Sequence, residues 1–283
     1  MPGPIDLHTH SSVSDGTESP TELIASGVLA GLGVLAITDH DSTAGWREAG
    51  AAAQGTGLTV IPGMELSTNN GPASVHILAY LFDPDDPMIR TETARIRDGR
   101  LHRAERIVQK IAADYNITWS DVLAQSVNGA TLGRPHIADA LVANGVVPDR
   151  SAAFESILHW RSGYFENYYA PSPLEGVRMI VAAGGVAVLA HPATGGRYRV
   201  MEEALISSLV DAGLGGLEIG HRDNTEDGKA RLIELAAAYD LIVTGSSDYH
   251  GAGKTNRLAE NSTEPGAFER ILAAGTGSAP YFG

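Results

Sequence analysis

The chain carries two histidines one residue apart in the stretch Asp6-Leu7-His8-Thr9-His10, at the end of an apolar run that starts at Pro4. In an extended strand, residues i and i+2 point to the same face. His8 and His10 can therefore bind one metal ion together. The run that precedes them is short enough to be a single strand, so the pair is expected at the end of that strand.

Further candidate metal ligands lie at or near the ends of later apolar runs. They are Asp15, which lies in the loop after the first run, and His40, Glu65, His191, His221, Asp248 and His250. His76 differs from them, because it lies early in its run. In parallel α/β barrels the active site lies at the C-terminal ends of the strands. The shared position therefore predicts one site built from residues that are far apart in the chain.

Seven short, β-branched runs are expected to be strands, at residues 5–7, 34–37, 58–61, 75–82, 186–190, 217–219 and 241–244. Helices expected at 19–32, 172–183, 202–212 and 227–239 separate most of them. Ser19 and Ser172 each begin a capping box with proline at the first helical position, and Thr263 is expected to cap the last helix. Strands that alternate with helices indicate a parallel sheet. Seven such units favour an α/β barrel over a small open sheet.

Residues 88–165 interrupt this alternation, because they contain no convincing strand. A long charged helix is expected to end near Tyr115, and shorter helices are expected at 119–125, 135–143 and 152–158. We therefore divide the chain into a barrel with the metal site, formed by residues 1–87 and 166–283, and a helical insert. The insert, residues 88–165, is expected to cover the active site.

The composition narrows the classes of function. A chain of 283 residues suits one large domain or one domain with an insert, and no apolar run approaches the ~20 residues that span a bilayer. The absence of cysteine and of a signal-like N-terminus favours a cytoplasmic protein. A formal charge of -14 argues against stable binding of duplex nucleic acid. It leaves a phosphate substrate possible, because bound cations neutralise nearby acids.

The metal site must use imidazole and carboxylate ligands, since there are no thiols, and these ligands suit Zn, Fe and Mn. A lone histidine is more often a surface residue or a hydrogen-bonded core residue than a ligand. Nine candidates in similar positions, however, favour a polynuclear site. Because each ion takes three or four nitrogen or oxygen ligands, the set predicts two or three divalent ions with at least one bridging carboxylate.

Five motifs together resemble the PHP (polymerase and histidinol phosphatase) family. They are Asp-Leu-His-Thr-His at 6–10, Ile-Thr-Asp-His-Asp at 37–41, Gly-Met-Glu at 63–65, Ala-His-Pro at 190–192 and Ser-Asp-Tyr-His-Gly at 247–251. The resemblance covers roughly residues 4–82 and 166–255. It implies a distorted (β/α)7 barrel with a trinuclear metal centre.

The same resemblance implies a role for each ligand. His8, His10, Glu65 and Asp248 resemble the ligands of the first metal, and Asp15, His40 and His250 resemble those of the second. Glu65, His76 and His191 resemble those of the third metal, with Glu65 as the bridge. Asp15 stands where some relatives have a histidine, so the identity of the second metal stays open.

The insert carries a further resemblance. Gly133-Arg134-Pro135-His136 begins a helix whose N-terminus favours anions. With His102-Arg103 on the preceding helix, it resembles the nucleoside 3′,5′-bisphosphate phosphatases of the PHP family, in which the insert grips substrate phosphates. The four side chains His102, Arg103, Arg134 and His136 are accordingly expected to bind substrate. The alternatives are an ordinary capped surface helix for Arg134 and His136 and a solvated helix face for Arg103. His159 is expected to be structural or on the surface.

The function expected from this resemblance is metal-dependent hydrolysis of a phosphate monoester. The substrate would be a nucleotide, with the 3′-phosphate of nucleoside 3′,5′-bisphosphates as the favoured target, and short RNA trimmed from its 5′ end as a further one. The bound metals would activate water, and Arg134 would stabilise the phosphoryl charge. His191 is expected beside the reacting atoms, and His221 is expected to contact the phosphate or the leaving group. The alternatives are a histidinol-phosphate phosphatase or another hydrolase of this family, and a non-catalytic metal-binding module.

Overall fold

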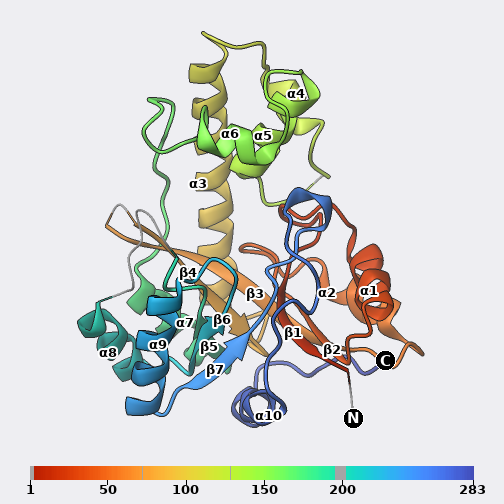
Figure 1. Cartoon of the computed structure of the whole chain (residues 1–283), viewed down its shortest axis with the longest axis vertical. Coiled ribbons are helices and arrows are strands. Elements are labelled where there is room, and N and C mark those ends of the chain that lie inside the picture. The colour runs from red at the N-terminus through yellow and green to blue at the C-terminus, as the bar shows by residue number, and fades with distance from the viewer. Residues whose placement is uncertain (1–2, 72, 128, 195–201) are drawn as a thin grey trace.

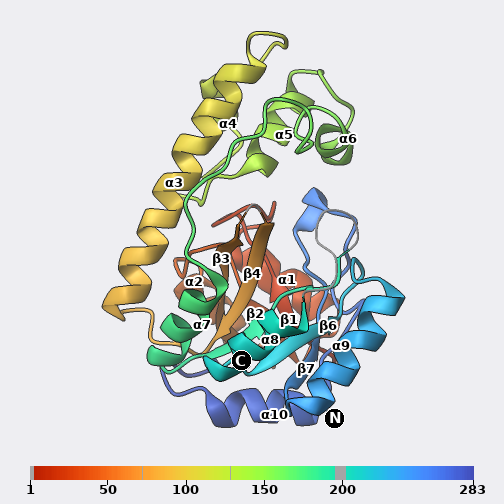
Figure 2. The same ribbon diagram turned by 90° about the vertical axis from the view of Figure 1, so that its left-hand side faces the viewer.

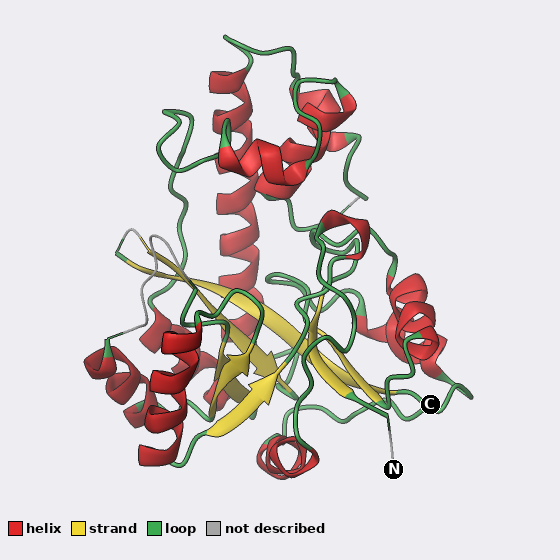
Figure 3. Ribbon diagram, viewed as in Figure 1, coloured by secondary structure: helices red, strands yellow, loops and turns green. Residues whose placement is uncertain are grey.

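The computed structural model describes residues 3–71, 73–127, 129–194 and 202–283, with a seven-stranded sheet at its centre (Figures 1 and 3). The strands follow one another in chain order: β1 (Ile5–Thr9), β2 (Val34–Ile37), β3 (Thr59–Asn70), β4 (Ala73–Tyr80), β5 (Val186–Leu189), β6 (Gly216–Gly220) and β7 (Ile242–Gly245). A parallel bridge between Thr9 and Tyr249 brings β1 to the segment beyond β7. The sheet is therefore a nearly closed barrel, and the predicted α/β barrel is confirmed.

One strand departs from the expected parallel arrangement. β4 is antiparallel to both β3 and β5, whereas the other neighbouring pairs are parallel. β3 and β4 pair as far as Asn70 and Ala73, which leaves no room for the helix that a parallel crossover needs. The reversal places His76, near the start of β4, at the same edge of the barrel as the ends of the parallel strands. This explains why His76 did not fit the pattern in the sequence.

Helices cover the outside and the lower end of the barrel. They are α1 (Pro20–Leu29), α2 (Trp46–Ala53), α7 (Pro173–Ala182), α8 (Glu203–Asp211), α9 (Glu226–Ala238) and α10 (Pro265–Ala274). The capping boxes at Ser19 and Ser172 are present as predicted. α2 was not predicted, because its N-cap, Gly45, makes no side-chain cap. The expectation for Thr263 was wrong: Glu264 is the N-cap of α10, and the Thr263 hydroxyl donates to the Gly245 carbonyl.

Alternate residues of the strands enter two separate apolar clusters. On β2, Val34 and Ala36 belong to a cluster inside the barrel, together with side chains of α10 such as Ile271. Leu35 and Ile37 belong to the cluster between the strands and the outer helices. Because both faces of these strands are buried, their sequences are continuously apolar. The inner cluster and α10 close one end of the barrel (Figure 2). Polar side chains are therefore concentrated at the other end.

The helices that lie between β4 and α7, termed the inserted region, are α3 (Pro87–Ile111), α4 (Trp119–Leu123), α5 (Arg134–Ala143) and α6 (Arg150–Glu155). Figure 2 shows α3 rising along one side of the barrel and the shorter helices lying above its mouth. A third apolar cluster, which includes Ile107, Val122 and Leu141, joins these four helices. Ile89 and Ile96, in the first half of α3, belong to the outer cluster of the barrel. No helix within the described ranges is both long and apolar enough to cross a membrane.

A buried hydrogen bond inside the barrel provides a test of this packing. The Tyr80 hydroxyl donates to the Leu7 carbonyl at 2.9 Å, and both residues are fully buried. Tyr80→Phe removes this buried hydrogen bond, so we expect the free energy of unfolding to fall by about 0.5–1.5 kcal/mol. Urea denaturation measures the change. Tyr115→Phe, at a position that is 39% exposed, is the control, and equal stability of the two variants would contradict the role assigned to this bond.

Candidate metal centre

The barrel mouth brings together candidates from six of the seven strands or from the loops that follow them. His8 lies on β1 and His10 directly after it, His40 follows β2, and Asp248 and His250 follow β7. Glu65 was expected after the end of the third strand, but it lies inside β3, which continues to Asn70. Its backbone forms a parallel bridge with His40. Glu65 is therefore held by the sheet on both sides, with a side chain that is 2% exposed.

The first group of donors consists of His8, His10, Glu65 and Asp248. His8 Nε2 lies 3.0 Å from His10 Nε2, 3.2 Å from Glu65 Oε2 and 3.4 Å from Asp248 Oδ1. His10 Nε2 lies 3.1 Å and 3.3 Å from the same two oxygens. Four donors about 2.1 Å from one ion at the corners of a tetrahedron lie about 3.4 Å apart. The observed separations therefore fit one divalent ion.

The second group surrounds Asp15 in the loop after β1. Asp15 Oδ1 lies 3.2 Å from His250 Nε2, and Asp15 Oδ2 lies 3.7 Å from His40 Nε2. His10, Asp15 and His250 offer donor atoms that lie within 4.8 Å of one another, whereas His40 forms such a group with Glu65 and His76. His40 thus lies between two groups, with Nε2 toward Asp15 and Nδ1 toward Glu65, 3.3 Å from Oε2.

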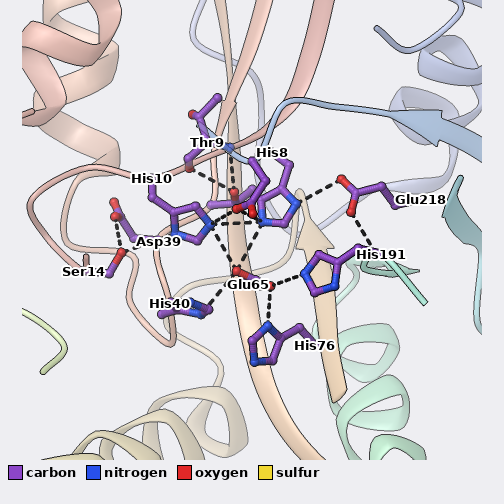
Figure 4. Close-up of polar contacts among 12 residues, drawn as sticks. His8, Thr9, His10, Ser14, Asp39, His40, Glu65, His76, His191 and Glu218 are labelled. Carbon is purple, nitrogen blue, oxygen red and sulfur yellow. Dashed lines mark hydrogen bonds and ion pairs between the residues drawn. The ribbon is translucent and has the colours of Figure 1, made fainter. Parts of the chain in front are cut away.

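The third group faces the other oxygen of Glu65. Glu65 Oε1 lies 2.6 Å from His76 Nδ1 and 3.2 Å from His191 Nε2, while Oε2 faces His8 and His10 (Figure 4). A carboxylate with its two oxygens turned to two different sets of imidazoles has the geometry of a bridging ligand. The structure thus brings all nine candidate ligands together around the predicted bridge.

Several acids that sequence reasoning missed hold these ligands in place. Glu218, on β6, lies with Oε1 3.0 Å from His8 Nδ1 and accepts the His191 backbone N–H through Oε2. Asp39 accepts hydrogen bonds from the hydroxyls of Ser11 and Ser14 in the loop that carries Asp15. The available signal was a charged residue inside an apolar run, because a buried carboxylate needs a partner.

A basic residue is also paired with a candidate ligand. Lys254 Nζ donates to Asp248 Oδ2 at 2.6 Å, which leaves Oδ1 directed at His8 and His10. Asp41, His191 and Asp248 have φ values of 53°, 31° and 54°. Non-glycine residues in the left-handed region cost energy and gather at functional sites. Three of them at the barrel mouth indicate a functional site.

The charges within the cluster depend on one another. Burial alone would lower the pKa of His10, but hydrogen bonds to Asp248 and Glu65 raise it to about 9. Burial alone would raise the pKa of Glu218, but the neighbouring His8 ring lowers it to about 2. A cation bound to His10 must displace a proton from it at neutral pH. Metal binding is therefore expected to release protons and to strengthen as the pH rises.

A cavity of about 1120 Å³ lies between the barrel mouth and the inserted helices. Candidate ligands at its floor include Asp15, His40, Glu65, His76 and His191. Its basic lining residues are Arg100, Arg103, Arg134, Arg150, Arg222 and Lys254. Seven carboxylates line it as well, those of Asp15, Glu65, Glu155, Glu166, Glu202, Asp223 and Asp248. Its attraction for an anionic ligand therefore depends on cations bound at the candidate ligands.

Arg103 and Arg134, two of the candidate substrate contacts, line this cavity. The Arg103 guanidinium donates to the Glu166 carbonyl at 2.9 Å and lies 4.8 Å from the centre of the Tyr168 ring. The Arg134 guanidinium lies 5.3 Å from the centre of the Phe154 ring. Aromatic contacts of this kind hold the planar guanidinium groups in position beside the cavity.

Three other candidates are placed differently from the prediction. His102 pairs with Asp98 and Glu105 on an exposed face of α3, because neighbouring helical residues face different directions and Arg103 takes the inner one. His136 is 3% exposed, and its ring accepts the Gly133 N–H at 3.2 Å, so it caps its own helix.

His221 is fully buried, with Nε2 3.6 Å from Asp248 Oδ2. The chain folds β6 against β7 in this region, which places the ring behind Asp248 and not among the described residues of the cavity wall. The contacts of His102, His136 and His221 with substrate remain predictions, and none of the three is among the described residues that line the cavity. His159 lies beside Trp160 in the inserted region, outside the described cavity lining.

The sequence profile of the PHP domain matches residues 6–166. The chain belongs to the PHP family. It is 35% identical over 264 residues to the 3′,5′-nucleoside bisphosphate phosphatase of Chromobacterium violaceum, with 89% of each chain covered. It is 33% identical over 249 residues to a 5′-3′ exoribonuclease of Haemophilus influenzae, with 87% of this chain and 89% of the relative covered.

Solved structures agree with this assignment. A protein from Bifidobacterium adolescentis, described as a candidate metal-dependent phosphoesterase, is 42% identical and superposes with a TM-score of 0.94 over 98% of each chain. A Chromobacterium violaceum protein described as an amidohydrolase with bound sulfate is 31% identical, with a TM-score of 0.86 over 96% of this chain and 97% of that one. The predicted PHP membership and barrel fold are confirmed.

Glu218 gives a test of how the PHP ligands are supported. Glu218→Gln keeps the size of the side chain but removes the charge beside His8 Nδ1. Partners of this kind orient metal-binding histidines, and their loss typically weakens metal affinity by about 10–100-fold. Chelator competition with Mn²⁺ measures the affinity. Glu226→Gln, in the exposed first turn of α9, is the control, and unchanged affinity in Glu218→Gln would contradict the role given to Glu218.

Proposed function

We propose that this protein is a metal-dependent phosphatase that removes the 3′-phosphate from nucleoside 3′,5′-bisphosphates. Its relatives include a bisphosphate phosphatase, exoribonucleases and a cyclic phosphate diphosphodiesterase, and each of these names describes cleavage of a phosphate ester. The observation that carries the finer proposal is the arginine-lined cavity directly above the cluster of nine ligands. One part of the cavity suits the reacting phosphate, and the arginines of the inserted helices suit a second phosphate.

The residues that would hold divalent ions form three sets around Glu65. His8, His10, Glu65 and Asp248 form the first set, Asp15, His40 and His250 the second, and Glu65, His76 and His191 the third. Imidazole and carboxylate donors suit Mn, Fe and Zn. When bound, such ions would polarise the phosphoryl oxygens and lower the pKa of water. The first and third sets share Glu65, so loss of this one side chain is expected to affect more than one ion.

The chain's own residues would then bind and orient the substrate. His191, whose ring lines the cavity and contacts Glu65, would stand beside the reacting phosphate. Arg134 and Arg103 would bind the second phosphate, since a guanidinium offers two parallel N–H groups to phosphate oxygens. Lys254, at 42% exposure beside Asp248, would add positive charge near the reacting group.

A short RNA is a second candidate substrate, favoured by the size of the cavity. Pockets for drug-sized ligands are about 300–1,000 Å³, and this cavity of about 1120 Å³ exceeds that range. The aromatic rings of Phe154, Phe165 and Tyr168 also line it. Rings in such a position allow bases to stack, which is the usual mode of binding for single-stranded RNA.

One steady-state experiment tests the proposed function. Adenosine 3′,5′-bisphosphate, histidinol phosphate and a short 5′-phosphorylated oligoribonucleotide are compared as substrates at equal metal concentration. We expect the bisphosphate to have the highest kcat/KM, and we expect chelation to abolish turnover and added Mn²⁺ to restore it. Preference for histidinol phosphate would favour the alternative phosphatase, and full turnover in verified metal-free protein would exclude the metal-dependent reaction.

Arg134→Ala tests the second phosphate site. A hydrogen bond to a charged group is worth roughly 1.5–3 kcal/mol, so we expect kcat/KM for the bisphosphate to fall by about 10–100-fold. A nucleoside 3′-monophosphate lacks the second phosphate and should lose much less. Arg161→Ala, which removes a guanidinium that lies 4.2 Å from the centre of the Trp160 ring, is the control. Equal losses with both substrates would place Arg134 at the reacting phosphate, and no loss would leave it a structural role.

A further inference from the structure

Residues of the inserted helices contact the loops that carry the second set of donors. The first contact is made by Arg150, at the start of α6. Its Nε and Nη2 pair with the two carboxylate oxygens of Asp139 on α5, each at 2.5 Å. Its Nη1 donates to the backbone carbonyl of Asp15 at 3.1 Å. The Asp139 carboxylate thus fixes the guanidinium in the orientation that holds the Asp15 loop.

The same guanidinium also touches the loop after β7. A Cβ atom added to Gly253 would lie 2.0 Å from Arg150 Nη1, so the backbone there lies directly against the guanidinium. Gly253 follows His250 by three residues, and its N–H donates to the His250 carbonyl. His250 in turn faces Asp15 across 3.2 Å. One side chain of the inserted region therefore holds two loops whose ligands belong to the same set.

A second contact reaches the loop that carries His40. Arg97 Nη1, on α3, donates to the Asp41 carbonyl at 2.6 Å, and Arg100 Nε lies 3.0 Å from Asp41 Oδ2. Asp41 directly follows His40 and has a φ of 53°, a conformation that costs energy in a non-glycine residue. The two arginines support this conformation and so fix where the His40 ring lies.

The other donors have a different kind of support. His8, Glu65 and His76 lie on β1, β3 and β4 and are positioned by the hydrogen bonds of the sheet. Asp15, His40 and His250 lie beyond the ends of strands, as do His10, His191 and Asp248. Arg150, Arg97 and Arg100 contact the loops that carry Asp15, His40 and His250. The three arginines therefore contact the loops of all three residues of the second set, whereas His8, Glu65 and His76 are held by the sheet.

We propose that the inserted region is a positioning device for the second metal set, and that Arg150 is its principal positioning residue. This inference rests on the proposed metal-dependent function. It predicts that disturbing Arg150 weakens binding of one ion while the ions held by the strands remain. It also links the substrate cavity to the metal site. The inserted helices carry both Arg134, which would bind the substrate, and Arg150, which holds the Asp15 loop.

Arg150→Ala tests the proposal through metal binding. We expect one class of Mn²⁺ site to weaken by about 10–100-fold, the usual effect of removing a partner that orients a ligand, while the remaining sites keep their affinity. Titration of metal-free protein, followed by elemental analysis, measures both. Arg106→Ala is the matched control, because Arg106 lies on α3 of the same inserted region and its guanidinium contacts the Glu166 carboxylate and the Asn167 carbonyl.

Two further variants keep the test decisive if Arg150→Ala folds poorly. Asp139→Asn removes the charge that orients Arg150 but leaves Arg150 in place, and it should weaken the same class of site. Gly253→Ala adds a methyl group that displaces the Arg150 guanidinium from the barrel, and it should also weaken this class of site. Unchanged Mn²⁺ affinity in folded Asp139→Asn and Gly253→Ala would overturn the inference. Absence of Mn²⁺ binding in the wild-type protein would instead overturn the proposed function on which it rests.

Discussion

The site depends on a single buried carboxylate, that of Glu65. Its two oxygens lie within 3.3 Å of five imidazoles, those of His8, His10, His40, His76 and His191. A buried charge is tolerated only when it is paired and hydrogen-bonded. The histidines supply that pairing, and they come from four strands or the residues just after them. The position of Glu65 in the middle of β3 therefore requires the barrel to close around it.

The antiparallel strand β4 makes this arrangement possible. A parallel fourth strand would place the start of the strand, and His76 with it, at the end of the barrel closed by α10. The hairpin between β3 and β4 instead turns His76 toward Glu65, 2.6 Å away. The same hairpin leads directly into α3, so the reversal also sets the direction in which the inserted helices rise (Figure 2). The hairpin between β3 and β4 therefore affects both the metal site and the position of the helices above the cavity.

Charge is distributed unevenly over the molecule, and this has a consequence for binding. The chain as a whole is acidic, with a formal charge of -14, and the cavity combines five arginines and a lysine with seven carboxylates. An acidic surface repels long polyanions, while cations bound by the carboxylates of the cavity would allow its arginines to attract a small anion. The combination favours nucleotides and short oligonucleotides over duplex nucleic acid. It also explains why net charge alone is a poor guide to the substrate.

The sequence by itself determined the barrel, the nine candidate ligands and the family, because strand ends and short motifs are local patterns. It could not determine the direction of β4, since a strand pattern reads the same for either orientation. Nor could it separate Arg103 from His102 or Glu218 from His221, because the face on which a side chain lies depends on packing. Only the tertiary structure decided that His221 is buried behind Asp248 and that Arg150 reaches Asp15, a contact between residues 135 positions apart.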